Sequence, residues 1–172
     1  MNIVNPQTAL VSLSDKSNLN HIIDFLVKKK IKILSTGGTY NAIKKITDNV
    51  VEVSEFTGFD EMMDGRVKTL HPKIHAGILA RRDSDLELLK EKGYETIDLV
   101  IVNLYPFEET IKKDCSFEDA IENIDIGGPT MIRAAAKNFQ DVVVLSDPND
   151  YEKITREWDS NDGLSLIHIS EP

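Results

Sequence analysis

The run Leu99-Val100-Ile101-Val102-Asn103-Leu104 is the most strand-like stretch in this chain of 172 residues. Its apolar residues follow one another without polar alternation, which is typical of a strand in a parallel sheet that helices cover on both faces. Four further short apolar runs are interpreted as strands, at residues 8–13, 31–35, 50–53 and 142–145. We therefore expect one parallel β-sheet.

Amphipathic stretches separate these runs and predict helices at residues 19–29, 40–46, 84–92, 117–122, 129–137 and 149–158. Ser84 and Glu87 have the spacing of a capping box, which favours a helix that begins at Ser84. Residues 78–80 predict one further short element. Because strands alternate with helices, the expected fold class is α/β, with a parallel sheet flanked by helices on both faces in three layers.

The composition is that of one globular domain large enough to bury a core, with 41% hydrophobic and 28% charged residues. A net charge of −9 argues against broad nucleic-acid binding and against adhesion to an anionic membrane, but it is compatible with a local basic pocket for a phosphorylated ligand. The single cysteine, Cys115, excludes an internal disulfide and a cysteine-rich zinc site. With no signal segment and no apolar run of about 20 residues, we expect a cytoplasmic protein.

The end of the chain differs in character from the rest. Residues 160–172 start with Ser-Asn-Asp-Gly, finish on an alternating apolar stretch without an evident partner, and look like translated adapter read-through. We therefore expect a truncated domain over residues 1–158 and a tail of foreign origin over residues 159–172. His168 lies in that tail and is given no functional weight.

Residues 64–77 combine two glycines with an Arg, two Lys, two His and a Pro, and they show no sustained helical or strand period. This pattern predicts a shaped loop that holds an anion, with cationic groups at Arg66, Lys68 and Lys73. The alternative is a solvated surface loop with incidental charges.

Two histidines in this segment, His71 and His75, have a spacing that can bind a metal when it falls on a helix. Pro72 lies between them, however, and no acidic ligand is suitably spaced. We therefore expect hydrogen-bonded loop histidines and no metal site.

Polar or glycine-rich segments directly follow three of the expected strands: Ser14-Asp15-Lys16, Ser35-Thr36-Gly37-Gly38-Thr39 and Asn103-Leu104-Tyr105. Ligands of parallel sheets gather at the carboxyl ends of the strands. Two glycines before a helix also let backbone N–H groups converge on a phosphate. The alternatives are a helix cap at Ser14 or Asp15, a plain Gly-Gly turn, and a strand exit with a surface tyrosine.

A second glycine-rich entry to a helix is Asp125-Ile126-Gly127-Gly128-Pro129-Thr130, in which Pro129 suits the first helical turn. Lys137 lies about 12 Å along the axis from the start of this helix. Asp125 and Lys137 therefore cannot pair unless the orientation of the helix or a ligand between them helps. An ordinary helix with a favourable C-terminal Lys is the alternative.

Six motifs, in this order, resemble the IMP cyclohydrolase domain of the bifunctional purine-biosynthesis enzyme AICAR transformylase/IMP cyclohydrolase. They are Ser14-Asp15-Lys16, Ser35-Thr36-Gly37-Gly38-Thr39, Gly65-Arg66-Val67-Lys68-Thr69-Leu70-His71-Pro72, Asn103-Leu104-Tyr105-Pro106-Phe107, Asp125-Ile126-Gly127-Gly128 and Arg133-Ala134-Ala135-Ala136-Lys137-Asn138. The resemblance covers residues 8–151, and its most specific motif lies at residues 66–72. It implies a methylglyoxal-synthase-like fold, in agreement with the expected three layers.

The resemblance implies the last step of de novo purine biosynthesis, in which FAICAR closes its ring with loss of water to give IMP. It assigns the catalytic set to Lys68, Tyr105, Asp125 and Lys137, with Asp125 and Lys137 handling protons. The nucleotide would be bound by Ser14, Asp15, Lys16, Thr36, Gly37, Gly38, Thr39, Arg66, Val67, Thr69, Asn103 and Ile126. Neither a metal nor an organic cofactor is implied.

The transformylase domain of the family is not in this chain, so we expect no folate-dependent reaction. The full-length family forms a homodimer largely through that domain, and we expect this chain to be a monomer or a weak dimer. Its partner would be a small nucleotide, with neither nucleic acid nor a membrane involved. Two alternatives use the same fold: methylglyoxal synthase, which does not need the motif at residues 66–72, and a non-catalytic nucleotide sensor like that of carbamoyl phosphate synthetase.

Overall fold

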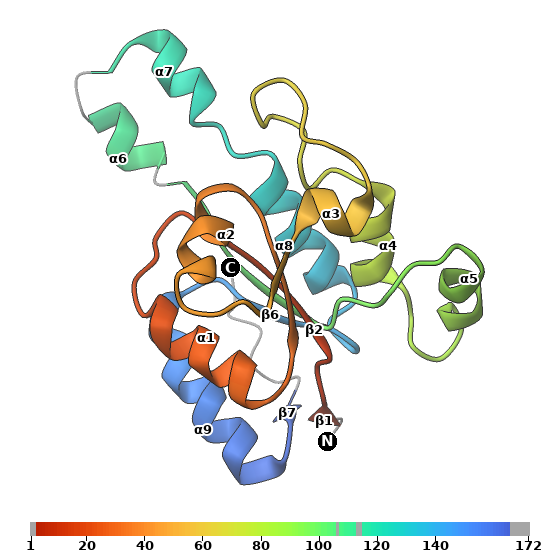
Figure 1. The fold of residues 1–172 in the computed structure, drawn as a ribbon. Coiled ribbons are helices and arrows are strands. Elements are labelled where there is room, and N and C mark those ends of the chain that lie inside the picture. Colours follow the sequence, from red (N-terminus) through yellow and green to blue (C-terminus); the bar gives the residue numbers. More distant parts are fainter. Residues whose placement is uncertain (1–2, 106, 113–114, 166–172) are drawn as a thin grey trace.

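The computed structural model describes residues 3–105, 107–112 and 115–165. Its centre is a five-stranded parallel sheet in the order β4-β3-β2-β5-β6 (Figure 1). The strands are β2 (Thr8–Leu13), β3 (Lys32–Ser35), β4 (Val50–Glu52), β5 (Leu99–Asn103) and β6 (Val143–Leu145). The prediction of one parallel sheet is confirmed, and each expected strand is present with ends that differ by at most one residue.

The continuous apolar pattern of β5 follows from its place inside the sheet. Leu99 and Ile101 pack into the core on one face, whereas Val100 and Val102 pack into the core on the other. All four side chains are at most 1% exposed. Because both faces are covered, polar alternation has no place in this strand.

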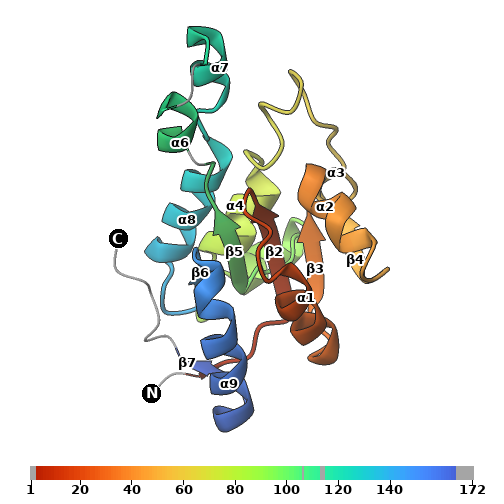
Figure 2. The same ribbon diagram turned by 90° about the vertical axis from the view of Figure 1, so that its left-hand side faces the viewer.

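Helices cover both faces of the sheet, which confirms the expected three-layer α/β class (Figure 2). One face is covered by α1 (Leu19–Lys28), α2 (Gly37–Lys44) and α9 (Tyr151–Asn161), whose apolar residues share one core cluster. The other face is covered by α3 (Val53–Thr57), α4 (Pro72–Leu79) and α8 (Gly127–Lys137).

Several expected boundaries are wrong. The segment at residues 64–77 is a loop only as far as His71, because Pro72 occupies the first turn of α4, where its missing N–H costs nothing. That helix also contains most of the short element expected at residues 78–80. The helix α5 (Leu86–Glu91) begins after Ser84, and the expected capping box does not form, since Asp85 binds Arg81 instead.

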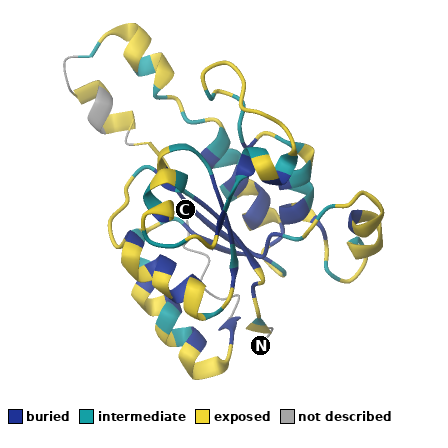
Figure 3. Ribbon diagram, in the orientation of Figure 1, coloured by how far each residue is buried: buried dark blue, intermediate teal, exposed yellow. Residues whose placement is uncertain are grey.

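The structure also contains elements that the sequence pattern did not predict. They include α3 and α6 (Phe107–Lys112), as well as a 3-10 turn, η1 (Pro148–Asp150), before α9. The helix α7 (Phe117–Glu122) has the expected bounds and carries a capping box between Ser116 and Asp119. α6 and α7 form an arm that projects beyond the sheet and is largely exposed (Figure 3).

The two ends of the described chain meet in a small antiparallel pair. β1 (Ile3–Val4) pairs with β7 (Leu164–Ser165), and α9 continues to Asn161. The rest of the expected tail, including His168, lies outside the described residues. In the part of the chain that is described, no helix is both long and apolar enough to cross a membrane.

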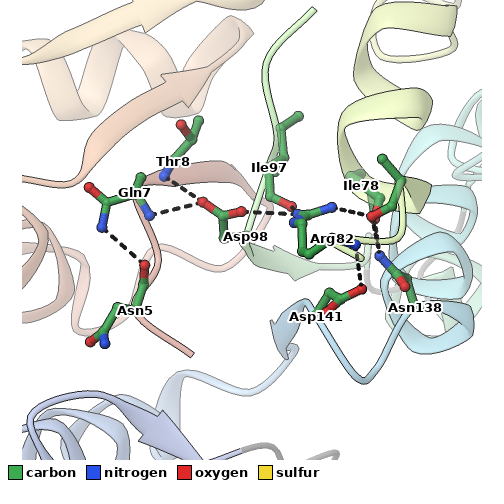
Figure 4. A network of polar contacts seen from close by, with 10 residues as sticks. Asn5, Gln7, Thr8, Ile78, Arg82, Ile97, Asp98, Asn138 and Asp141 are labelled. Carbon is green, nitrogen blue, oxygen red and sulfur yellow. Dashed lines mark hydrogen bonds and ion pairs between the residues drawn. The ribbon is translucent and has the colours of Figure 1, made fainter. Parts of the chain in front are cut away.

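A buried polar network fastens the amino ends of the central strands (Figure 4). Asp98, which is 7% exposed, accepts hydrogen bonds from the backbone N–H groups of Gln7 and Thr8 at 2.9 and 3.2 Å. Its other oxygen accepts from Arg82 Nη2 at 3.0 Å, and the backbone N–H of Arg82 donates to Asp141. The network therefore joins β2, β5 and the segments next to α4 and β6.

Asp98→Ala is expected to lower the free energy of unfolding by about 3 kcal/mol, because it leaves the Arg82 guanidinium and two backbone N–H groups without their acceptor. Urea denaturation measures the effect. Glu95→Gln is the matched control, since its ion pair with Lys32 is exposed and should contribute less than about 1 kcal/mol. Equal losses in the two variants would contradict this role for Asp98.

Candidate functional site

The carboxyl ends of β2, β3 and β5 lie at one edge of the sheet because the strands are parallel. The loop between α3 and α4 and the start of α8 lie at the same edge (Figure 1, Figure 2). This edge brings together most of the residues that the sequence proposes for a site. Their contacts show what each one does in the fold.

Asn103, at the end of β5, ties the loop after β2 to the sheet. Its Oδ1 accepts from the backbone N–H groups of Ser14 and Asp15 at 2.7 and 2.9 Å, and its Nδ2 donates to the Asp15 carbonyl at 2.7 Å. The Lys16 side chain folds back toward the end of β2, where Nζ donates to the Leu13 carbonyl at 3.0 Å. The Asn103 amide thus uses most of its hydrogen-bonding capacity to hold the shape of this loop.

Asp15 closes the turn before α1. Its Oδ1 accepts from the hydroxyl and the backbone N–H of Ser17, and these hydrogen bonds hold the pKa of Asp15 below its usual range. The N-cap of α1 is Asn18, which makes no side-chain cap. The helix cap proposed at Asp15 is therefore wrong, and Asp15 instead stabilises a local turn.

The glycine-rich start of α2 is locked to the end of β2. The Thr39 hydroxyl accepts from the Leu13 N–H at 2.9 Å and donates to the Leu13 carbonyl at 3.0 Å, and Thr39 is 4% exposed. Gly37 has φ +56°, a conformation that glycine adopts without strain. A phosphate at this helix start would therefore meet the backbone of residues 36–38 rather than the Thr39 hydroxyl.

Lys68 extends from its loop across two glycines. Its Nζ lies 2.7 Å from Glu61 Oε2, and its side chain is 27% exposed. A Cβ on Gly65 would lie 2.5 Å from Lys68 Cε, and a Cβ on Gly37 would lie 3.3 Å from Lys68 Nζ. The two glycines leave the space that the Lys68 side chain fills, so the loop and the start of α2 form one site.

Arg66 joins the same loop to the arm. Its guanidinium pairs with Glu122 of α7, and this hydrogen-bonded pair raises the pKa of Arg66. Both side chains are more than half exposed. Arg66 is thus held by an exchangeable surface contact at the edge of the site, where an anionic ligand can compete with Glu122.

The start of α8 packs against the loop that carries Lys68. Thr69 is buried, and a Cβ on Gly127 would lie 2.6 Å from its Oγ1. Asp125 Oδ1 accepts from the Gly128 N–H at 2.8 Å. The carboxylate of Asp125 is therefore fixed at the N-terminus of α8, next in sequence to the exposed Ile126.

The remaining proposed residues are placed differently. Tyr105 follows β5 at the same edge and is 55% exposed. Val67 pairs with Met62 through its backbone. Lys137 is the last residue of α8 and lies about 15 Å along the axis from Gly127. The structure does not bring Lys137 together with Asp125.

Lys73, His71 and His75 each make contacts within the fold. Lys73 Nζ donates to the Phe56 carbonyl at 2.6 Å, so a hydrogen bond within the fold holds this ammonium group. His71 caps α4 by accepting from the Lys73 N–H at 3.1 Å, whereas His75 lies within that helix and not in a loop. No group of three metal-ligating side chains occurs among the described residues.

His75 Nε2 is buried and has no hydrogen-bond partner among the described groups. Burial lowers the pKa of His75 below its ordinary value of 6.5, and a backbone hydrogen bond with Thr69 offsets this only in part. Folded His75 therefore stays neutral at a pH where the unfolded chain already takes up a proton. This difference makes stability fall as the pH drops below about 6.5.

His75→Gln is expected to remove part of that acid sensitivity. The loss of unfolding free energy between about pH 7 and about pH 5 should be smaller in the variant than in the wild type, because Gln has no proton to gain. Urea midpoints at the two pH values measure the difference. An equal loss in both proteins would show that His75 does not couple stability to pH.

Some residues at this edge are missing from the sequence interpretation. Glu61 and Glu122 hold the two cations of the loop, and nothing in their sequence context indicates this. Asp147 follows β6, so the strand-end rule applied to that strand would have found it. Burial raises the pKa of Tyr151 to about 12, with further contributions from the Asp15 and Asp147 carboxylates.

A hollow of about 430 Å³ lies at the opposite edge of the sheet, against the Asp98 network. Its charged residues are Arg82, Asp98 and Asp141. Arg82 binds Asp98 at 3.0 Å, and the backbone N–H of Arg82 donates to Asp141 at 3.1 Å. These charged groups bind one another within the network that joins the strands, and the geometry favours the carboxyl edge as the functional site.

Comparison with known proteins supports this choice. The family model described as MGS-like domain matches residues 18–130. Two curated relatives are named bifunctional purine biosynthesis protein PurH. The one from Fusobacterium nucleatum subsp. nucleatum is 57% identical over 159 residues, which are 91% of this chain and 32% of the relative. The one from Clostridium acetobutylicum is 59% identical over 148 residues, 85% of this chain and 30% of the relative.

A solved structure, described as "Crystal structure of ForH", superposes with a TM-score of 0.77 at 35% identity, and the match covers 92% of this chain and 83% of that one. The chain spans about a third of the length of the curated relatives it matches. The resemblance to the bifunctional purine-biosynthesis enzymes is thereby confirmed. Since the family model matches well over half of its residues, the chain belongs to the MGS-like domain family.

Proposed function

We propose that this chain is an IMP cyclohydrolase, which closes the ring of FAICAR with loss of water to give IMP. The observation that carries the proposal is the convergence of Lys68 with Gly65 and Gly37, since it joins a cationic loop to a glycine-rich helix start at the ligand-binding edge of the sheet. The identity of 57% with a bifunctional purine biosynthesis protein supports the choice of substrate.

The reaction requires few groups. The carboxamide nitrogen of FAICAR attacks the formyl carbon, a C–N bond forms, and the former formyl oxygen leaves as water with one proton from that nitrogen and one from the formamido nitrogen. Lys68 would stabilise the negative charge that develops on this oxygen, and Tyr105 would orient the substrate. Asp125 would accept a proton from the nitrogen and pass it to the departing hydroxyl. No electrons leave the substrate, so the scheme requires no redox cofactor.

The phosphate end of the nucleotide would lie at the start of α2. There the backbone of Gly37 and Gly38 offers N–H groups and Lys16, in the loop at residues 14–16, offers positive charge, while Arg66 exchanges Glu122 for the substrate. The further residues implied by the resemblance are Thr36, Thr39, Val67, Thr69, Asn103 and Ile126. The side chains of Thr39 and Asn103 already bind the loop after β2, so these two would act mainly by shaping the site. We expect a cytoplasmic enzyme that acts as a monomer or a weak dimer.

Lys137 enters the proposed set through the resemblance alone. Lys137→Ala is expected to lower kcat for FAICAR cyclisation by about tenfold or more, because the proposed role of Lys137 is proton transfer. The rate of IMP formation measures it, with the exposed Lys90→Ala as the control. An unchanged kcat would remove Lys137 from the set, and its place at the far end of α8 from Asp125 would then explain the result.

The proposal is tested by adding FAICAR to the purified chain and following IMP by its ultraviolet absorbance. A parallel assay with dihydroxyacetone phosphate tests for methylglyoxal synthase. Turnover of FAICAR alone supports the proposal. Production of methylglyoxal, or tight binding of IMP without turnover, would overturn it in favour of the other enzyme or of a nucleotide sensor.

A further inference from the structure

Residues 61–68 form a small hairpin whose register sets Glu61 against Lys68. Met62 and Val67 form an antiparallel bridge, with N–H to carbonyl distances of 3.1 Å in one direction and 3.2 Å in the other. The next pair outward from this bridge is Glu61 with Lys68. Directly opposed residues of an antiparallel pair have neighbouring side chains, so the register itself brings the two charges together.

The turn of this hairpin is unusual in its backbone. Met63, Asp64 and Gly65 all have positive φ, at 56°, 53° and 88°. Two of them are not glycine, and such conformations persist where the surrounding structure requires them, often at functional sites. The N–H groups of Gly65 and Arg66 close the turn by donating to the carbonyls of Met62 and Met63. This strained turn fixes the register that pairs Glu61 with Lys68.

The glycine at the end of the turn has a second role. A Cβ at Gly65 would lie 2.5 Å from Lys68 Cε and 2.8 Å from Lys68 Nζ, so the Lys68 stem crosses directly over the turn. A lysine carries a compact charge on a flexible four-carbon stem, and one contact at the end of that stem decides where the charge lies. Here the contact is Glu61 Oε2, 2.7 Å from Nζ.

We propose that Glu61 is a positioning residue for Lys68, which it holds over Gly65 and Gly37 as part of the reacting centre. This inference rests on the proposed function, because it gives Glu61 a role only if Lys68 acts on the substrate. The pair is too exposed to contribute much to folding, since Glu61 is 55% exposed and surface ion pairs add little stability. Its loss is therefore expected to appear in catalysis and in the exposure of Lys68.

The test compares Glu61→Gln with Asp60→Asn in the 172-residue chain. Asp60 is the adjacent acidic residue, is exposed, and has no ion pair among the described groups. Steady-state kinetics with FAICAR give kcat and KM separately. Independently of activity, acetylation of Lys68 by acetic anhydride, followed by peptide mass spectrometry, gives the reactivity of its ammonium group.

Glu61→Gln is expected to lower kcat roughly tenfold with little change in KM, because a displaced catalytic group loses rate rather than ground-state binding. Lys68 should be acetylated faster in this variant, and Asp60→Asn should match the wild type in both measurements. A wild-type kcat, a change confined to KM, or unaltered labelling of Lys68 would each overturn the inference. A wild-type chain without FAICAR turnover would instead overturn the proposed function, while labelling still decides whether Glu61 holds Lys68.

Discussion

Lys68→Met is expected to lower kcat for FAICAR cyclisation by about 10²–10³-fold, because it removes the cation that would face the developing oxyanion. Methionine retains an unbranched apolar stem that can cross Gly65, so the variant tests the charge more than the packing. Initial rates of IMP formation over a range of FAICAR concentrations give kcat and KM.

The expected pattern is a large loss in kcat with a small change in KM, since the phosphate would be bound at the start of α2. Lys90→Met on α5 is the matched control, because it removes an exposed lysine that is not part of the proposed site. In Lys68→Met the free energy of unfolding should change by less than about 1 kcal/mol, because the ion pair with Glu61 lies near the surface. A loss confined to KM would make Lys68 a binding residue.

The strands could be predicted because burial on both faces leaves a local record in the sequence. Leu99 to Val102 show it most clearly, as they divide between two cores. Helix starts were harder, because hydrogen bonds that are not visible in local spacing decide them. Ser84 has the right spacing to Glu87, but Asp85 binds the Arg81 guanidinium and α5 begins later.

Part of the site could be predicted from the rule that ligands meet the carboxyl ends of parallel strands. That rule identified the segments after β2, β3 and β5, and the structure brings them together. It could not predict Glu61 or Glu122, because one depends on a hairpin register and the other on where α7 lies. Helix geometry did predict that Asp125 and Lys137 lie apart.

Asp125→Asn is the second change with a large expected effect, and it separates two roles of one carboxylate. Asp125 Oδ1 accepts the Gly128 N–H at 2.8 Å, and an Asn side chain can keep this acceptor. Asn cannot accept the proton that the attacking nitrogen must lose. We therefore expect kcat to fall by about 10²–10⁴-fold while α8 keeps its start and the chain keeps its stability.

Asp125→Ala is the informative comparison, because it removes both the proton acceptor and the hydrogen bond to Gly128. It should match Asp125→Asn in kcat and also lose about 1 kcal/mol of unfolding free energy in urea denaturation. If Asp125→Asn keeps the wild-type kcat and Asp125→Ala loses it, the carboxylate acts by placing the start of α8. The proton would then have to leave through another group at this edge. The candidate is the exposed phenol of Tyr105, which follows β5.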